Sequence, residues 1–510
     1  MNFLVRGKYV ITDPKMGKKS ILYDSAAYIK ENKIIEIDDY TLLKEKYPNA
    51  VIKGNGKQLL MPGLIDGHSH GAGLSPFQRG VHYDFLENFL MNSANGIVLK
   101  PQLKATMCAI RHLRNGCTTL HCIQGGNQLD AEYVEKIFQG YEKVGIRFAY
   151  SSGVRDLNSI TYDDAAFYQT LPPELKQLVK PIIFNDKEAF IKAYFEHFEY
   201  LYNHYNSEDR KIIFGPLWVQ GSADKFLQQI KTKADELGKI SIHLHTLQTP
   251  IQKVFGLKKY GKSLLAHLDD LGLVDNNLVL GHAVFINQSD IDLLAAKHAS
   301  NTHHASCNLV VRNGIAPVYF LHQAGVNVAL GIDDKGINDD EDPFMEMRMI
   351  YYLHRIAGFD LTKTPPLSSF DILQMATINA ARVCHFEGTI GALKPGMKAD
   401  LLLVDLDRIM ESPWVSPGIN IADLLICRGK GTDVNTVMVN GNIILENHRF
   451  CHIDVDSIYE EVREQVKKGI DPKQKELAEI MQKLKPYSQS FYKRWPTPEL
   501  VPFYKMNSRK

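Results

Sequence analysis

The chain has 510 residues, 45% of them hydrophobic and 23% charged, which is an ordinary balance for a globular protein in water. Its 59 Lys and Arg against 58 Asp and Glu leave a formal charge of +1, which gives no electrostatic reason to expect nucleic acid or an anionic membrane as partner. From the length we expect one large domain with appended structure. We find no long apolar run, no signal-peptide core and no paired cysteine spacing, so we expect a cytoplasmic protein with reduced thiols.

Both ends of the chain have the alternating pattern of short β-strands. Asn32-Lys33 and Asn440-Gly441 have the composition of tight turns, and the strands at either end are too few to bury a core alone. We therefore predict a small β-sandwich domain assembled from residues 1–60 and 388–450. The expected strands are 3–5, 9–11, 26–29, 34–37, 399–404, 434–439 and 442–445.

The centre of the chain, residues 61–387, alternates short apolar runs with helical patterns, as is typical of a parallel α/β fold. Eight such runs over this length predict a (β/α)8 TIM barrel, and long insertions at 71–104 and 155–205 can cover a site. The expected strands are the run that ends at His68, then 116–120, 146–150, 212–217, 240–243, 278–282, 299–303 and 326–330.

Residues 451–510 are predicted to form a C-terminal helical extension. Apolar residues recur at helical spacing between 455 and 486, with breaks near Gly469 and Pro472. The tail beyond them is interpreted as a packing arm or an oligomer contact.

The first predicted barrel strand ends in His68-Ser69-His70. Residues i and i+2 of an extended strand point to the same face, so the two imidazoles converge on one point. Two neutral imidazoles at that spacing suit a borderline metal ion such as zinc. A polar loop after a strand is the alternative interpretation, and a lone His-x-His pair would favour it.

Histidines recur at the ends of four predicted strands, although the chain has only 19 of them. In a barrel the catalytic groups lie at the carboxyl ends of the strands. Chance or core packing explains any one of these histidines, but not readily all of them together with a closing aspartate. The strand-end residues are His68, His70, His243, His245, His282, His303, His304 and Asp333.

Six segments together resemble the metal-dependent amidohydrolase superfamily, in the branch of cytosine deaminases, triazine hydrolases and methylthioadenosine/S-adenosylhomocysteine deaminases. They span most of the chain from about residue 55 to 450. The resemblance implies a barrel that carries one catalytic metal ion, and a terminal sandwich. The segments are MPGLIDGHSHG (61–71), ISIHLHTLQT (240–249), LGHAVFINQSDIDLLA (280–295), SCNLVVRNGIAPV (306–318), LGIDD (330–334) and GTIGALKPGMKADLLLVD (388–405).

Carried over position by position, the resemblance implies that the metal ligands are His68, His70, a histidine of the fifth strand, and Asp333. No lysine stands near the end of the fourth strand, residues 215–218, where binuclear relatives have a carbamylated lysine. We therefore expect one divalent metal ion. Zinc is the first expectation, with iron, cobalt and manganese as alternatives.

The fifth-strand ligand is ambiguous between His243 and His245. The family pattern His-x-x-Glu-Thr matches from His245, with Gln248 where the family has glutamate. Alignment from His243 places Thr246 at the glutamate position, which is a poorer match. We favour His245 as the ligand, and His243 is then expected to line the pocket.

These parts predict hydrolysis by a metal-activated water. Asp333 is expected to accept the proton of that water, and His282 to polarise the bond under attack or to hold the hydroxide. In deaminating relatives the glutamate at position 248 helps to carry the proton, which the amide of Gln248 cannot do. Either His243, His282 or His304 takes over this transfer, or the leaving group needs little protonation, or activity is low.

The predicted substrate contacts are His243, His304 and Asn308. Arg312, Gln78 and Arg79 could also reach the pocket, although a charged loop residue is more often solvated.

We therefore predict a metal-dependent hydrolase that cleaves a non-peptide C–N bond: an amide, a carbamate or urea-like bond, or the amino group of a heterocycle. Gln248 shifts the expectation from ring deamination towards the other bonds. The alternative is a catalytically silent amidohydrolase-like ligand-binding or scaffold protein, which would have lost metal ligands. A barrel enzyme of sugar metabolism would have paired carboxylates at its strand ends instead. The expected partner is a small-molecule substrate, and a homo-oligomer is the default assembly.

Overall fold

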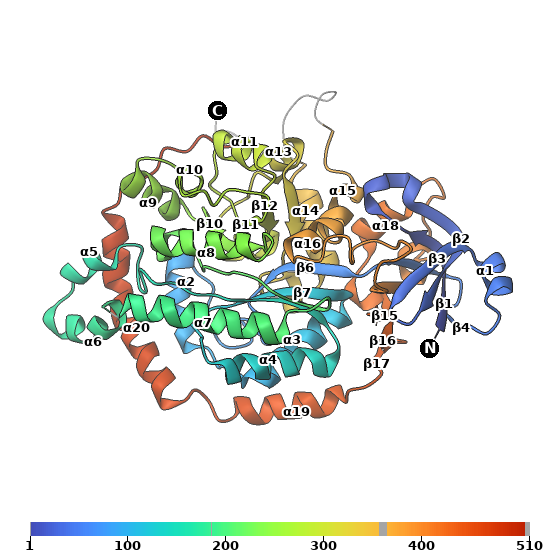
Figure 1. Cartoon of the computed structure of the whole chain (residues 1–510), viewed down its shortest axis with the longest axis horizontal. Coiled ribbons are helices and arrows are strands. Elements are labelled where there is room, and N and C mark those ends of the chain that lie inside the picture. Colours follow the sequence, from blue (N-terminus) through green and yellow to red (C-terminus); the bar gives the residue numbers. More distant parts are fainter. Residues whose placement is uncertain (1, 185, 356–364, 505–510) are drawn as a thin grey trace.

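The protein is described by a computed structural model that covers residues 2–184, 186–355 and 365–504. A mixed sheet built from both ends of the chain lies beside a larger region of parallel strands and helices, and two C-terminal helices run along that region (Figure 1). No helix within these ranges is long and apolar enough to cross a membrane.

The mixed sheet has nine strands in the order β17-β16-β15-β14-β5-β1-β2-β3, with β4 beside β1. The antiparallel pairing of β5 with β14 joins the two ends of the chain, with Leu60 opposite Leu403. Strands from both ends therefore share one sheet, and its arrangement as a sandwich stays a prediction. The strands are β1 (Asn2–Ile11), β2 (Ile21–Lys30), β3 (Lys33–Asp39), β4 (Val51–Lys53), β5 (Gln58–Pro62), β14 (Leu401–Asp405), β15 (Val434–Val439), β16 (Asn442–Glu446) and β17 (Arg449–Phe450).

Two details of this sheet differ from the prediction. The strands expected at 3–5 and 9–11 are one strand, because the pairing with β2 continues through Gly7, opposite Ser25. The hairpin between β2 and β3 turns at residues 31–32 and not at Asn32-Lys33, because Lys33 already pairs with Lys30. The turn at Asn440-Gly441 lies between β15 and β16, as predicted.

Eight parallel strands make up the central region, in two four-stranded sheets with the orders β6-β7-β8-β9 and β10-β11-β12-β13. A parallel bridge between Phe214 and Ile242 joins β10 to the chain after β9. Near the other ends of the two sheets, the Asp333 N–H donates to the carbonyl oxygen of His68 at 2.9 Å. The strands are β6 (Leu64–Ser69), β7 (Cys117–Gln124), β8 (Arg147–Ser152), β9 (Arg210–Ile212), β10 (Ile242–Thr246), β11 (Leu278–His282), β12 (Ser300–His303) and β13 (Asn327–Leu330).

Two of the differences between predicted and observed strand bounds bear on the site. The strand expected at 212–217 is continuous only over Arg210–Ile212, and isolated bridges at Phe214, Pro216 and Trp218 continue its pairing. The strand expected at 240–243 continues to Thr246. Both His243 and His245 therefore lie inside β10, with their side chains on the same face.

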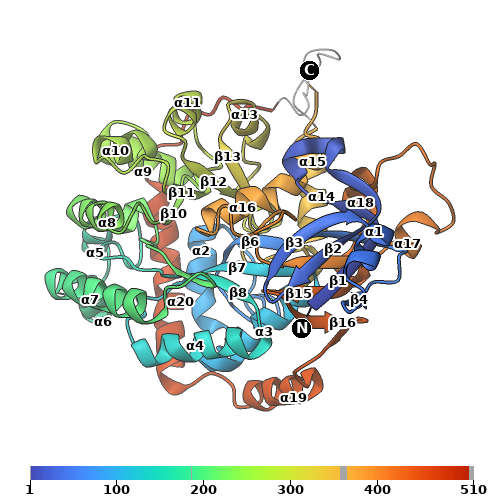
Figure 2. The same cartoon turned by 45° about the vertical axis from the view of Figure 1, so that its right-hand side comes forward.

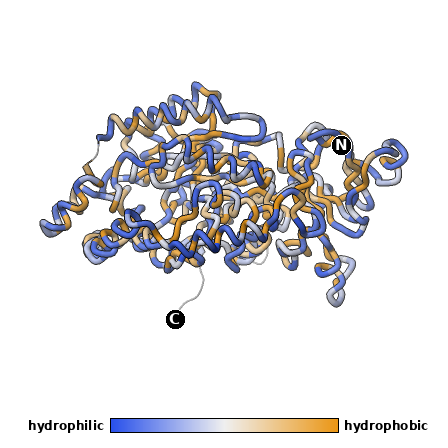
Figure 3. The backbone as a smooth tube through the Cα atoms, turned by 90° about the horizontal axis from the view of Figure 1, so that it is seen from below, coloured by the Kyte–Doolittle hydropathy of each residue, from blue (hydrophilic) through white to orange (hydrophobic). Residues whose placement is uncertain are grey.

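Helices cover the outside of the parallel strands, and hydrophilic and hydrophobic residues alternate along them (Figures 2 and 3). The predicted insertions contain α2 with the start of α3, and α5 to α7. The helices are α1 (Tyr40–Lys46), α2 (Leu86–Asn92), α3 (Pro101–Arg114), α4 (Ala131–Val144), α5 (Asp164–Gln169), α6 (Pro173–Ile183), α7 (Lys187–Tyr205), α8 (Asp224–Glu236), α9 (Pro250–Tyr260), α10 (Leu264–Asp270), α11 (Gln288–Ala296), α12 (Ala305–Val310), α13 (Val318–Gln323), α14 (Pro343–Leu353), α15 (Ser369–Met375), α16 (Ile378–Val383), α17 (Asp407–Met410), α18 (Ile421–Arg428), α19 (Val455–Val466) and α20 (Pro472–Lys493).

The C-terminal helices α19 and α20 are separated at the predicted break. Leu484 and Phe491 of α20 are buried in a cluster with Phe167 of α5 and Leu175 of α6. Helix α20 thus holds the second insertion against the central region (Figure 1).

Candidate metal centre

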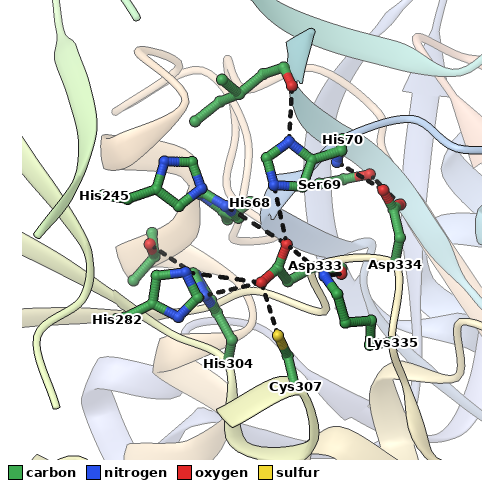
Figure 4. A network of polar contacts seen from close by, with 12 residues as sticks. His68, Ser69, His70, His245, His282, His304, Cys307, Asp333, Asp334 and Lys335 are labelled. Atoms are coloured by element: carbon green, nitrogen blue, oxygen red, sulfur yellow. Dashed lines mark hydrogen bonds and ion pairs between the residues drawn. The ribbon is translucent and has the colours of Figure 1, made fainter. Parts of the chain in front are cut away.

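The carboxylate of Asp333 lies at the centre of a histidine cluster built from strand ends (Figure 4). Its Oδ1 is 3.1 Å from Nε2 of His70 and 3.8 Å from Nε2 of His68, both on β6 or directly after it. Its Oδ2 is 3.7 Å from Nε2 of His282, the last residue of β11. The structure thus brings together four side chains that the sequence placed at three separate strand ends.

The outer ring nitrogens of two histidines are held by backbone carbonyl groups. Nδ1 of His70 donates to Ile123 at 2.9 Å, and Nδ1 of His245 donates to Leu217 at 2.7 Å. Each bond fixes the proton on Nδ1 and leaves a lone pair on Nε2, which is the arrangement of a histidine that binds a metal ion.

The donor atoms of the cluster lie close enough together to share an ion. Those of His68, His70 and His245 lie within 4.8 Å of one another, as do those of His68, His282, His304 and Asp333. In the described part of the chain, Nε2 of His68 and Nε2 of His282 are buried without a hydrogen-bond partner. Nitrogen and carboxylate donors in such a group fit zinc and similar divalent ions.

The two histidines of β10 lie in different surroundings. His245 lines the cavity described below, whereas Nε2 of His243 lies 3.0 Å from Nδ1 of His68. His243 is fully buried and stacks at an angle on His121, with ring centroids 4.6 Å apart. It therefore contacts the back of the His68 ring, away from the Nε2 that faces Asp333.

The backbone at this site is held in an uncommon conformation. φ is +71° at His282, +61° at Asp333 and +55° at Asp334, in the left-handed region that residues other than glycine rarely adopt. A Cβ at Gly331 would lie 2.6 Å from Cδ2 of His304, so glycine permits that ring to approach β13. Strained strand ends that are held by their surroundings are a common property of functional sites.

The charge state of the cluster follows from burial and from Lys335. Burial alone would raise the pKa of Asp333, but the charge of Lys335, 3.3 Å from Oδ1, and the contact with His70 hold it well below its usual range. Burial lowers the pKa of His282 to about 4 and those of His68 and His245 well below the usual value. Burial also acts to lower the pKa of His70, but the contact with the Asp333 carboxylate outweighs burial and raises it. An ionised carboxylate and neutral imidazoles, as at His68, His245 and His282, are the forms in which these groups bind metal ions.

A cavity of about 610 Å³ opens from the cluster. Of the predicted site residues, His70, His245, Gln248, His282 and Asp333 line it, as does Arg79. Within the described ranges, His68, His243, His304, Asn308, Gln78 and Arg312 do not. Asn308 accepts a hydrogen bond from Nδ1 of His282 at 2.9 Å, and Nε2 of His304 lies 2.9 Å from Oγ1 of Thr302. None of His243, His304 and Asn308 lines the cavity in this structure. The substrate contacts expected of them stay predictions.

Sequence reasoning gave several residues no role in the site, and it interpreted Cys307 as a buried small residue, which it is. Lys335 donates to the carbonyl oxygen of Asp333 at 2.7 Å, and Cys307 donates to its Oδ2 at 2.9 Å. Glu87 of α2 lines the cavity, as does Met481 of α20. A lysine directly after the LGIDD segment was a visible signal, whereas nothing in the spacing of α2 or α20 indicated that they line the cavity.

Comparisons with known proteins found a matching family model and similar enzymes. The family model described as "Amidohydrolase family" matches residues 59–444. A 5-methylthioadenosine/S-adenosylhomocysteine deaminase from Caldanaerobacter subterraneus is 27% identical over 469 residues, which cover 91% of this chain and 97% of the relative. A 5'-deoxyadenosine deaminase from Methanosarcina acetivorans is 27% identical over 473 residues, with the same coverage of 91% and 97%.

Solved structures show the same fold. An adenosine deaminase from Xanthomonas campestris with bound zinc has a TM-score of 0.77 at 23% identity, over 91% of this chain and 98% of that one. Atrazine chlorohydrolase TrzN from Arthrobacter aurescens, complexed with zinc, has a TM-score of 0.76 at 21% identity, over 91% and 100%.

Proposed function

Because this chain belongs to the amidohydrolase family, we propose that its histidine–aspartate cluster holds one divalent metal ion, zinc in the first place. The chain is an enzyme, a hydrolase of carbon–nitrogen bonds other than peptide bonds. The proposed ligands are His68, His70, His245 and Asp333. The observation that carries this proposal is the convergence of His68 Nε2 and His70 Nε2 on Oδ1 of Asp333, at 3.8 and 3.1 Å.

An ion bound there supplies the positive charge that lowers the pKa of a nearby water towards neutrality. Asp333 is ionised, so a free lone pair of its carboxylate can accept a proton from that water. Nδ1 of His282 donates to Asn308, which leaves Nε2 as an acceptor that can hold the water in place. Lys335 keeps the Asp333 carboxylate in position through its bond to the backbone oxygen of the same residue.

The departing nitrogen needs a proton, and Gln248 cannot provide one, so the proton that Asp333 accepts from the water has to pass to the nitrogen directly or through His282. The side chain of Gln248 lines the cavity beside the cluster, so it can hold a substrate by a hydrogen bond. This favours amide, carbamate or urea-like bonds over ring deamination in this chain. The deaminases among its relatives keep ring deamination as the alternative substrate class.

Metal content and product release test this function together. The protein is purified without added metal, its metal is measured per chain by elemental analysis, and His70→Asn is analysed beside it. Amides, carbamates, 5'-methylthioadenosine, S-adenosylhomocysteine and 5'-deoxyadenosine are then screened for ammonia or amine release. We expect about one divalent ion per chain, which His70→Asn loses, and release from at least one class. Absence of metal in both proteins, even after zinc is supplied, would support the silent scaffold instead.

The finer organisation of the chain is part of the same proposal. We infer that the eight parallel strands close into a (β/α)8 barrel over residues 61–387, which the Phe214–Ile242 bridge supports at one junction. Residues 1–60 and 388–450 form the sandwich domain, and residues 451–510 form the extension. A homo-oligomer in the cytoplasm is the expected state, and size-exclusion chromatography with light scattering tests the assembly.

A further inference from the structure

Four cationic side chains line the cavity: Arg79, Lys104, Arg155 and Lys335. Lys335 pairs with Asp333 of the metal centre, at 3.3 Å from Oδ1. We propose that the substrate has an oxyanion, a carboxylate or a phosphate, which binds to Lys104 and Arg155 while its C–N bond lies at the metal centre. This inference rests on the proposed function, since it assigns a class of substrate to the same site.

The two cations lie on either side of one loop, between β7 and α4. Nζ of Lys104, on α3, donates to Oε1 of Gln124 at the end of β7, at 2.8 Å. Arg155 follows β8, and its backbone N–H donates to Oδ1 of Asn127 at 2.9 Å. Nδ2 of Asn127 donates to the backbone carbonyl oxygen of Arg155, also at 2.9 Å. The loop from Gln124 to Asn127 is thus fixed at both of its ends by the residues that carry the charges.

Two glycines between these fixed points leave room for a ligand. Gly125 and Gly126 both line the cavity, and a Cβ at either would have no atom within 4 Å. Gly126 has a φ of +97°, a conformation that other residues rarely adopt. We call Lys104, Gly125, Gly126 and Arg155 the anion subsite.

Neither cation of the subsite has an ionic partner in the structure. Across the described ranges, no carboxylate oxygen lies within 4.0 Å of a side-chain nitrogen of Lys104 or Arg155. The Arg155 guanidinium lies over the Trp218 ring, 5.3 Å from its centroid. Burial lowers the pKa of both groups and outweighs the opposing charges of Asp334 on Lys104 and of Asp164 on Arg155. A cation that has lost solvation and has no ion-pair partner is unfavourable, so a bound anion would stabilise this arrangement.

The other carboxylates of the cavity are engaged elsewhere. Glu87 accepts hydrogen bonds from Thr249 at 2.6 Å and Tyr162 at 2.9 Å. Asp334 accepts from the Ser69 hydroxyl at 2.8 Å and the His70 N–H at 2.9 Å. Neither carboxylate forms an ion pair with Lys104 or Arg155, so both cations can still pair with a bound anion.

Apolar and aromatic side chains line the same cavity as the anion subsite. They include Leu86 and Phe89 of α2, Trp218, and Met481 of α20. The substrate that fits this lining has an anionic group, an apolar or aromatic body, and a hydrolysable C–N bond. A guanidinium and an ammonium bind carboxylate or phosphate through charge-assisted hydrogen bonds.

Binding of small aromatic probes tests the subsite without a known substrate. Benzoate and phenyl phosphate are titrated into the metal-loaded protein by calorimetry, with benzamide as the neutral analogue of similar shape. Arg155→Met and Lys104→Met remove the charge but keep an unbranched apolar side chain, and Arg463→Met on the exposed face of α19 is the control. Elemental analysis of every variant establishes that the metal is retained.

We expect at least one of the two anions to bind about tenfold more tightly than benzamide, and each cavity variant to lose about tenfold of that affinity. The preferred anion then identifies carboxylate or phosphate as the source. Arg463→Met should bind like the wild type. Equal binding of benzamide, no binding of either anion at millimolar concentration, or anion binding that Arg155→Met leaves unchanged would overturn the proposal. Metal content and amine release are read separately, so the hydrolase function can stand when the subsite fails.

Discussion

The proposed metal centre and the proposed anion subsite lie in one cavity but are built from different kinds of side chain. The metal centre takes one buried carboxylate from the loop after β13, buried imidazoles from β6, β10 and β11, and the half-buried imidazole of His70 directly after β6. The anion subsite takes two partly buried cations and two glycines from α3 and from the loops after β7 and β8. Groups of the first kind activate a nucleophile, whereas groups of the second kind recognise charge and position a substrate.

This difference predicts where substitutions act on the kinetics. Changes at the metal centre should lower kcat or the metal content, since they remove groups that contact the reacting atoms. Changes at the anion subsite should raise KM for charged substrates more than they lower kcat.

The largest expected effect is that of Asp333→Asn. The amide cannot accept a proton from water, so kcat/KM should fall by about 10³-fold or more, even when the metal is restored. Asp334→Asn is the matched control, because it changes the neighbouring carboxylate, which accepts from Ser69 and the backbone of His70. Steady-state assays at saturating metal measure both. Equal losses in the two variants would place the proton acceptor elsewhere.

Gln248→Glu should have the next largest effect. It supplies a carboxyl group that can carry a proton to a leaving nitrogen, so ring deamination should become faster by about 10²-fold. Amide hydrolysis should change less, because the proposed reaction of this chain takes place without a carboxyl group at position 248. If every measured rate is unaffected, position 248 takes no part in the chemistry.

Much of the metal centre could be predicted because its residues follow strand ends in the sequence. His68, His70, His282 and Asp333 were placed together from periodicity and spacing alone, and the structure brings them together around Asp333. Parallel strands all present their carboxyl ends at one edge, so a local pattern is enough to predict that such residues meet.

The anion subsite could not be predicted in the same way. Lys104 lies inside a helix and Arg155 in a loop, and a lysine or an arginine at such places is usually solvated. Their common position depends on the bonds to Gln124 and Asn127, which no sequence period encodes. The position of α20 along the cavity depends likewise on its packing against α5 and α6.

A smaller effect is expected from His243→Asn, which tests a contact behind the metal centre. Its Nε2 lies 3.0 Å from Nδ1 of His68, so it orients a proposed ligand without touching the substrate. Loss of such a partner lowers metal affinity by about tenfold to a hundredfold. Competition with a chelator measures that affinity, and kcat at saturating zinc should stay near the wild-type value. A changed KM with unchanged metal affinity would favour the substrate contact that the sequence suggested.

The smallest expected effect concerns Glu346 of α14, which holds the residues next to the metal centre. It accepts from the N–H of Ser306 at 3.0 Å, and burial raises its pKa to about 7 from the ordinary value of 4.5. Between these two values the folded protein binds more protons than the unfolded chain, so this group makes stability fall as pH rises. The side chain of Glu346→Gln stays neutral at every pH, so the variant lacks this pH-dependent loss of stability. The Tm difference, variant minus wild type, should therefore be about 2 °C larger at pH 8 than at pH 5. Glu174→Gln on the exposed face of α6 should show no such trend in scanning calorimetry. A Tm difference between Glu346→Gln and wild type that does not change with pH would mean that the Glu346 carboxyl is charged in the folded state. The loops around the proposed metal centre would then hold a buried charge, as the proposed anion subsite does.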